Sequence, residues 1–225
     1  MKLNQLFNHK TRLYKNGLNE SIIKYVDFNK KILDVGCCEG TLGKYLKQHK
    51  QAVVFAIDIS SQAITQAQKN LDQAFTLNIE TDRLPFPQKS FDVIICADIL
   101  EHLFDPLAVL KKLKPFLKNN GIFILSIPNI ANIKIRWNLL LGRFYYQKDG
   151  IMDDSHVRFF TRKTSQKLVA DAGLKILALD YSPGFEFFFL KGRVLKIKIL
   201  KTLLYQLTKL SPSLFCAQFI IVAQL

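Results

Sequence analysis

The chain has 225 residues, 49% of them hydrophobic, and its 32 Lys and Arg against 18 Asp and Glu give a formal net charge of +14. This length and apolar content can form the core of one α/β domain, which excludes a disordered chain. The first residues lack the apolar core of a signal peptide, and no run of 18 uncharged apolar residues occurs. We therefore expect a cytoplasmic protein that does not span a membrane.

Strand and helix patterns alternate along the chain, which predicts a single α/β domain over residues 1–225 with a mainly parallel sheet. The expected strands lie near residues 31–36, 53–58, 74–78, 91–96, 121–127 and 174–181, with a last one over 215–223. Ligands in open sheets of this kind bind beyond the carboxyl ends of the strands, so the motifs at these ends are the candidate site.

The helices expected between these strands have recognisable ends. A polar lead-in, residues 1–30, contains an amphipathic helix near 18–27. A helix over 105–117 begins with an Asp cap and a first-turn proline, and the Asn-Asn-Gly sequence at 119–121 ends it before the next strand. A further helix is expected over 161–172 and is followed by glycine.

The first strand ends in a glycine-rich turn that contains Gly36, Gly40 and Gly43. Such a turn lets backbone approach a ligand closely, and the helix after it offers N–H groups to a carboxylate. A dinucleotide fingerprint needs glycine at position 38, which is Cys38 here. Asp58 ends the second strand, 22 residues after Gly36, where an acid can accept both hydroxyls of a ribose. The alternative is that Asp58 caps the helix that follows it.

The sequence Asp34-Val35-Gly36-Cys37-Cys38-Glu39-Gly40 resembles the first motif, D-x-G-x-G-x-G, of class I S-adenosylmethionine-dependent methyltransferases. The likeness continues through the turn at 84–87 and the strand after it. It implies a Rossmann-like sandwich with seven strands, the last antiparallel, and S-adenosylmethionine as cofactor. In place of the family's usual acid, an amide oxygen at position 78 would receive the adenine amino group. The cofactor-binding residues that the resemblance implies are Asp34, Gly36, Cys38, Gly40, Asp58, Ile59, Asn78, Ile79 and Cys96.

A narrower resemblance covers residues 126–162, from Ser-Ile-Pro-Asn to His-Val-Arg-Phe-Phe-Thr. It is similar to a bacterial methyltransferase subgroup associated with cell-surface glycan and lipid-linked precursor synthesis. This implies O-methylation of a small molecule such as a sugar or a lipid-linked glycan precursor. A related pattern occurs in accessory proteins of methionine biosynthesis, so a cofactor-binding regulatory protein is the alternative. Residues 129–160 form an aromatic-rich insertion after the fifth strand, expected to cap the cofactor or to face sugars or prenyl chains.

The fourth strand is followed by Asp98, Glu101 and His102, which would share one face of a helix. Three interpretations compete. Glu101 and His102 can brace the helix, or His102 can act as general base for an acceptor hydroxyl, a role that His156 of the insertion could also take. The three residues can also hold Mg²⁺ or Mn²⁺, a pattern similar to the E-x-x-E-H segment of metal-assisted 2′-O-methyltransferases of small RNAs.

The positive charge bears on the partners of the protein. The lysines are spread over the whole chain and do not form one arginine-rich stripe, so nucleic acid is an unfavoured partner and RNA methylation only an alternative. An anionic glycan, lipid or membrane surface is favoured over it. The basic amphipathic segment 185–210 would pack on the core or make a peripheral contact with the inner face of a membrane. The sequence does not indicate an oligomeric state.

Overall fold

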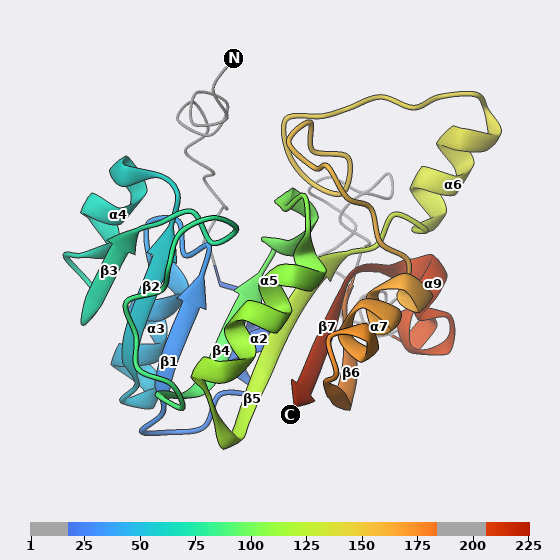
Figure 1. Ribbon diagram of the computed structural model, residues 1–225. Coiled ribbons are helices and arrows are strands. Elements are labelled where there is room, and N and C mark those ends of the chain that lie inside the picture. Colours follow the sequence, from blue (N-terminus) through green and yellow to red (C-terminus); the bar gives the residue numbers. More distant parts are fainter. Residues whose placement is uncertain (1–17, 184–205) are drawn as a thin grey trace.

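A computed structural model describes residues 18–183 and 206–225 (Figure 1). These residues form one seven-stranded sheet in the order β3-β2-β1-β4-β5-β7-β6. All strand pairs are parallel except those of β7, which runs antiparallel to β5 and to β6. The predicted fold class, including the antiparallel last strand, is confirmed. The strands are β1 (Lys31–Val35), β2 (Val53–Asp58), β3 (Gln73–Thr76), β4 (Phe91–Ala97), β5 (Leu117–Pro128), β6 (Lys175–Pro183) and β7 (Cys216–Gln224).

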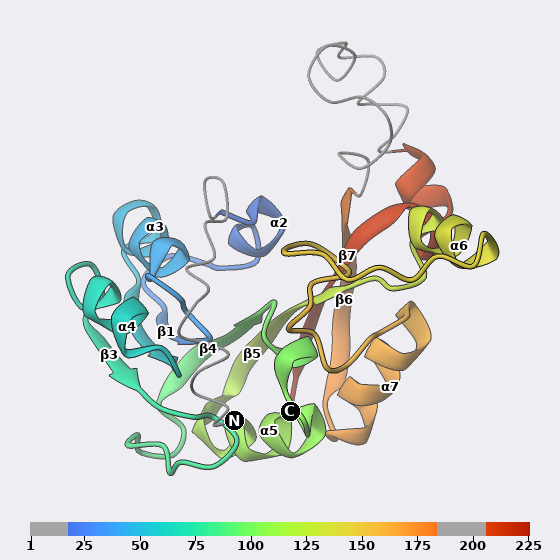
Figure 2. The same cartoon turned by 90° about the horizontal axis from the view of Figure 1, so that it is seen from above.

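Helices cover both faces of this sheet (Figure 2). The side chains of α2 (Glu20–Ile23), α3 (Thr41–Lys50) and α4 (Ser61–Ala67) belong to one apolar cluster. Those of α5 (Pro106–Leu113) and α7 (Arg162–Asp171) belong to the other. Because each central strand contributes residues to both clusters, its sequence is a nearly continuous apolar run, as parallel strands require.

Gly43 fixes the distance between α3 and the sheet. A Cβ at this position would lie 2.9 Å from the Val54 side chain and 2.7 Å from that of Leu71. The third glycine of the turn is therefore needed for packing between helix and strand, and this packing holds α3 against β2 near Val54.

Two sequence-based boundaries were wrong. The helix expected over 105–117 ends at Leu113, and a single 3₁₀ turn, Lys114–Phe116, leads into β5 at Leu117. Pro115 cannot donate a hydrogen bond, and Leu117 pairs with Phe91, so the strand runs through the Asn-Asn-Gly sequence. The helix expected near 18–27 is the single turn α2, after which the chain leaves the helix.

The insertion after β5 contains α6 (Ile133–Leu140) and a long loop that returns to α7. Hydrogen bonds attach the start of the insertion to the sheet. Asn129 and Asn132 are buried, and their side-chain amides donate to the Cys216 carbonyl at 3.1 and 2.9 Å. Asn129 also forms a bridge with Phe160 at the other end of the insertion.

No helix within the described ranges is both long and apolar enough to cross a bilayer. Most of the lead-in segment 1–30 and of the basic segment 185–210 lies outside the described residues. The sequence-based expectations for those parts stay predictions.

Candidate functional site

The glycine turn after β1 adopts left-handed backbone at three places: Gly36 (φ 75°), Cys38 (φ 48°) and Gly40 (φ 76°). The amides of Gly36 and Cys37 both donate to the Ile57 carbonyl, at 2.8 and 3.2 Å, which holds the turn against the end of β2. Gly40 is the N-cap of α3. The predicted strand, turn and helix are therefore present, with the amino end of α3 beside the turn.

Cys38 occupies backbone that favours glycine, which gives a prediction for Cys38→Gly. Relief of the left-handed conformation contributes about 1 kcal/mol, so the free energy of unfolding should not fall and cofactor affinity should be equal or higher. Urea titration and calorimetry measure the two quantities. Cys38→Ala is the matched control, because it removes the thiol and keeps the strained φ. A Cys38→Gly variant that binds cofactor but transfers no methyl would instead identify a catalytic thiol.

Two of the predicted cofactor residues accept hydrogen bonds from neighbouring amides. Asp58 ends β2, and its carboxylate accepts from the Cys38 and Ser60 amides, both at 2.8 Å, so it joins the glycine turn to the start of α4. The N-cap of α4 is Ser60, whose hydroxyl accepts from the Ala63 amide at 3.3 Å, so Asp58 is not the helix cap. Its role toward a ribose stays a prediction. The side-chain oxygen of Asn78 accepts from the Glu80 amide at 2.9 Å.

The other predicted cofactor residues surround the same end of the sheet. Ile59 follows β2 and is partly exposed, whereas Ile79 and Cys96 are buried. Burial raises the pKa of the Cys96 thiol, and burial together with nearby acids raises that of Cys37. Both thiols therefore stay protonated, which removes them as nucleophiles.

Asp34 is buried in β1 with 3% of its surface exposed. Burial, with a smaller contribution from the Asp58 carboxylate, raises its pKa from 3.8 to about 7. Asp34 in β1 and Asp58, which accepts from the Cys38 amide, therefore form a pair of neighbouring carboxyl groups, and Asp34 binds a proton near neutral pH in the absence of a cation. This acidic environment suits a ligand that carries positive charge.

The raised pKa of Asp34 predicts a pH dependence of stability. Unfolding lowers this pKa, so the unfolded chain loses the proton from about pH 4 upward while the folded chain keeps it until about pH 7. The free energy of unfolding should fall across that interval and level off above it, by roughly 4 kcal/mol at most. Asp34→Asn removes the titration. Urea unfolding of both proteins at a series of pH values measures the difference, and parallel curves would contradict the prediction.

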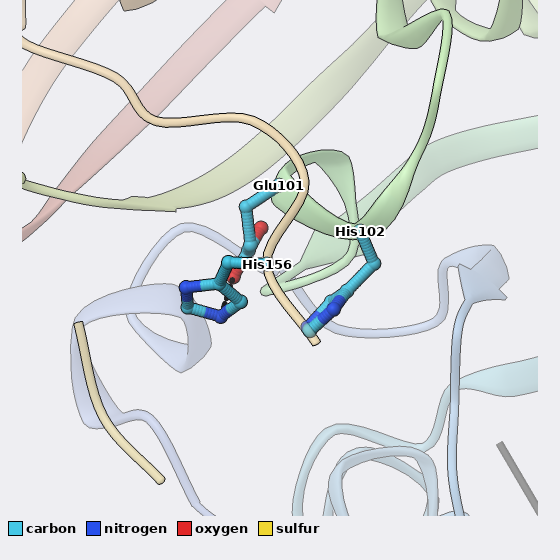
Figure 3. Close-up of side chains that lie close together, drawn as sticks. All are labelled: Glu101, His102 and His156. Atoms are coloured by element: carbon cyan, nitrogen blue, oxygen red, sulfur yellow. Dashed lines mark ion pairs between the residues drawn. The ribbon is translucent and has the colours of Figure 1, made fainter. Parts of the chain in front are cut away.

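A buried cluster lies beyond the carboxyl end of β4, formed by Glu101, His102 and His156 (Figure 3). Glu101 and His102 belong to a 3₁₀ turn, Leu100–His102, and His156 comes from the insertion. The His156 Nε2 and Glu101 Oε1 atoms are 3.7 Å apart, and the two imidazole rings have centroids 4.7 Å apart. One ligand atom from each residue lies within 4.8 Å of the others.

Backbone hydrogen bonds assemble this cluster from distant parts of the chain. The Val157 and Arg158 amides donate to the Glu101 carbonyl at 2.9 and 3.0 Å. His102 Nδ1 lies 3.1 Å from the Ser155 carbonyl, and His156 Nδ1 lies 3.0 Å from that of Ile151. A carbonyl can only accept, so each Nδ1 carries the proton and each neutral ring keeps its lone pair on Nε2.

Asp98 was expected on one helical face with Glu101 and His102, and the structure contradicts this placement. Asp98 has φ 52° and precedes the turn, so it is not part of a helix. Its Oδ1 accepts from the Ser126 hydroxyl at 2.9 Å and from Gln218 Nε2 at 2.8 Å, which ties β4 to β5 and β7. The residues that could hold a metal ion are therefore Glu101, His102 and His156, and Asp98 is not among them.

The sheet order, the glycine turn and the acid at the end of β2 together define a class I S-adenosylmethionine-dependent methyltransferase domain. Solved structures share this fold. A SAM-dependent methyltransferase from Methanosarcina mazei matches with a TM-score of 0.62 and 20% identity, covering 92% of this chain and 97% of that one. One from Archaeoglobus fulgidus matches with a TM-score of 0.61 and 16% identity, covering 92% and 90%.

Residues 8–179 match the family described as a methyltransferase domain, and the chain belongs to this family. Among curated relatives, the ubiquinone biosynthesis O-methyltransferase of Haemophilus ducreyi is 32% identical over 130 residues, or 54% of each chain. That of Idiomarina loihiensis is 30% identical over 181 residues, covering 76% of this chain and 71% of the relative. The chain thus spans about half the length of the first of these relatives. The expectation of a methyltransferase is confirmed at the level of the family.

Proposed function

We propose that this chain transfers the sulfonium methyl of S-adenosylmethionine to an oxygen of a small-molecule acceptor. The observation that carries the proposal is the buried Glu101, His102 and His156 cluster beyond β4, at the same end of the sheet as the glycine turn. The curated relatives named O-methyltransferases support oxygen as the accepting atom.

The residues of the glycine turn fit the cofactor by their chemistry. Asp58 can accept both ribose hydroxyls, and the carboxyl groups of Asp34 and Asp58 offer negative charge to a ligand with an ammonium and a sulfonium group. The bound cofactor supplies an activated methyl group. The chain's own contribution is to hold the accepting oxygen in line with that methyl, which can account for roughly 7–11 kcal/mol of the barrier.

The cluster can take the proton that the acceptor hydroxyl loses. The Nε2 atom of His156 carries the lone pair, and the resulting imidazolium would be stabilised by the Glu101 carboxylate 3.7 Å away. His102 offers a second Nε2 beside it. Both imidazoles are kept in the required tautomer by backbone carbonyls, so neither needs to reorganise before it accepts a proton.

The same donor set also fits a divalent cation. Each Nδ1–H contacts a carbonyl, an outer contact that is typical of metal-binding histidines. Two nitrogen ligands and one carboxylate suit Mn²⁺ better than Mg²⁺, which prefers oxygen. In this arrangement Glu101, His102 and His156 would hold the metal, and the metal would lower the pKa of the bound acceptor hydroxyl.

The acceptor that we favour is a hydroxyl on a sugar or a lipid-linked glycan precursor, with residues 129–160 as the cap over it. The curated relatives are named for ubiquinone biosynthesis, so their names support the oxygen and not the sugar. The test is methyl transfer from cofactor with a labelled methyl group to cell extracts. A labelled, extractable product supports the proposal, whereas tight cofactor binding without any transfer would favour an accessory protein.

A further inference from the structure

Residues 133–148, which we call the arm, expose an unusual number of large apolar side chains. The arm comprises α6 and the first part of the loop after it, and it projects beyond the carboxyl end of the sheet (Figure 1). Trp137, Leu140 and Tyr145 have 60%, 76% and 71% of their surface exposed. The arm also exposes Leu139, Leu141, Phe144 and Tyr146.

This exposure is concentrated in the arm. Elsewhere in the described ranges, large exposed apolar residues such as Phe28, Val53 and Leu177 come singly from separate elements. Single exposed apolar residues are normal, but a contiguous patch marks a surface that another body covers.

The charge of the arm has one sign only. Its sequence contains Lys134, Arg136, Arg143 and Lys148 and no Asp or Glu. Three of these cations are exposed, and Lys134 is partly exposed. Arginine and lysine side chains can lay their apolar stems along a hydrophobic surface while the charge reaches outward. Basic and aromatic side chains are therefore interleaved on one projecting element.

The arm is also firmly attached. Asn129 and Asn132 bind the sheet at its base, and Arg136 Nε donates to the Ala131 carbonyl at 2.7 Å. The Phe144 ring of the arm meets that of Phe159 edge-on, with centroids 6.4 Å apart, and the Phe159 ring lies 6.3 Å from that of His156. The loop part of the arm therefore lies near the Glu101, His102 and His156 cluster.

We propose that the arm docks on an anionic phospholipid bilayer. Tryptophan and tyrosine are favoured at the boundary between headgroups and acyl chains, leucines insert below it, and the cations pair with anionic headgroups. Stacking on nucleic-acid bases would use the aromatic rings and the cations, but it gives the run Leu139–Leu141 no partner. The arm and segment 185–210 are different parts of the sequence, and docking of the arm does not depend on the proposed methyl transfer.

Trp137 is the only tryptophan of the chain, so the tryptophan fluorescence of the protein reports directly on the arm. With the 225-residue chain, phosphatidylcholine vesicles that contain phosphatidylglycerol should shift the tryptophan emission to shorter wavelength. Lipids brominated on the acyl chain should quench that emission. Vesicles of phosphatidylcholine alone should bind more weakly, and added salt should weaken binding to the anionic vesicles.

Matched variants test whether the arm is responsible. Leu139 and Leu177 are both 48% exposed, so Leu139→Asp should weaken vesicle binding while Leu177→Asp should not. Arg143→Glu should weaken it by about ten-fold or more, since two units of charge are changed near the surface, and Lys163→Glu on α7 is its control. Equal binding by all four variants, or emission that anionic vesicles leave unchanged, would overturn the proposal. A blue-shifted emission without vesicles, lost together with a dimer in Leu139→Asp, would assign the arm to a second copy of the chain and also overturn it.

Discussion

Replacing His156 with alanine is expected to lower the turnover number for methyl transfer by about 10²- to 10⁴-fold, the range for loss of a positioned base. The Glu101 carboxylate lies 3.7 Å from His156 Nε2 inside a buried cluster and would stabilise the protonated ring, so alanine removes both the proton acceptor and this stabilisation. Cofactor affinity should be unchanged, because Asp58 and the glycine turn lie on other segments. Turnover with labelled cofactor and calorimetry with S-adenosylhomocysteine measure the two quantities.

The side chain of His156 also contacts the Ile151 carbonyl, so the alanine variant could disturb the insertion. His156→Asn separates the two effects, because the asparagine amide can still donate to that carbonyl and cannot act as a base. His49→Ala, on the exposed surface of α3, is the control. If the His102→Ala and His156→Ala variants both kept full turnover on the true acceptor, the assignment of the base would be wrong.

A chelator distinguishes the two forms of this mechanism. If the cluster holds a metal ion, EDTA should abolish transfer by the wild-type protein, and Mn²⁺ should restore it more fully than Mg²⁺. Turnover that EDTA leaves intact rejects the metal and leaves the imidazole as base.

Replacing Asp58 with alanine should weaken S-adenosylmethionine binding by about ten-fold or more. Each charge-assisted hydrogen bond from the ribose to this carboxylate contributes about 1.5–3 kcal/mol. The carboxylate also holds the Cys38 and Ser60 amides, so the glycine turn loses support in the same variant. Calorimetry on the purified protein measures the affinity.

Asp58→Asn keeps one acceptor oxygen and the shape of the side chain, so it should bind more tightly than Asp58→Ala and more weakly than wild type. Asp171→Ala, whose carboxylate pairs with Lys167 on the surface of α7, is the neutral control. Unchanged affinity of Asp58→Ala would remove this residue from the site. Tighter binding of a nicotinamide dinucleotide than of S-adenosylhomocysteine would contradict the cofactor proposal itself.

The features that could be predicted from sequence depend on local patterns. The strand ending at Val35, the glycine turn and the cap of α5 at Asp105 each follow from a few neighbouring residues, and all three are present. The end of α5 could not be predicted as well, because the pairing of Leu117 with Phe91 decides where β5 begins and no local signal reports that pairing.

The cluster shows the same limit at the candidate site. Glu101 and His102 were identified together because they are adjacent in the chain. His156 was identified separately, but its contact with Glu101 is set by hydrogen bonds between segments more than 50 residues apart. Asp98 was misplaced for the converse reason, because Ser126 and Gln218 bind its carboxylate and its φ is positive. Ser155, whose carbonyl contacts His102, carried no sequence signal at all.

The attachment of the insertion to Glu101 depends on main-chain atoms, and this bears on which residues of the insertion can vary. The carbonyl of Glu101 accepts from the main-chain amides of Val157 and Arg158, groups that every residue except proline supplies. These two hydrogen bonds therefore place no requirement on the side chain of Val157, whereas the Arg158 guanidinium also donates to the Phe104 carbonyl at 2.6 Å. The residue at position 157 can therefore change while the insertion keeps its main-chain attachment to the turn after β4.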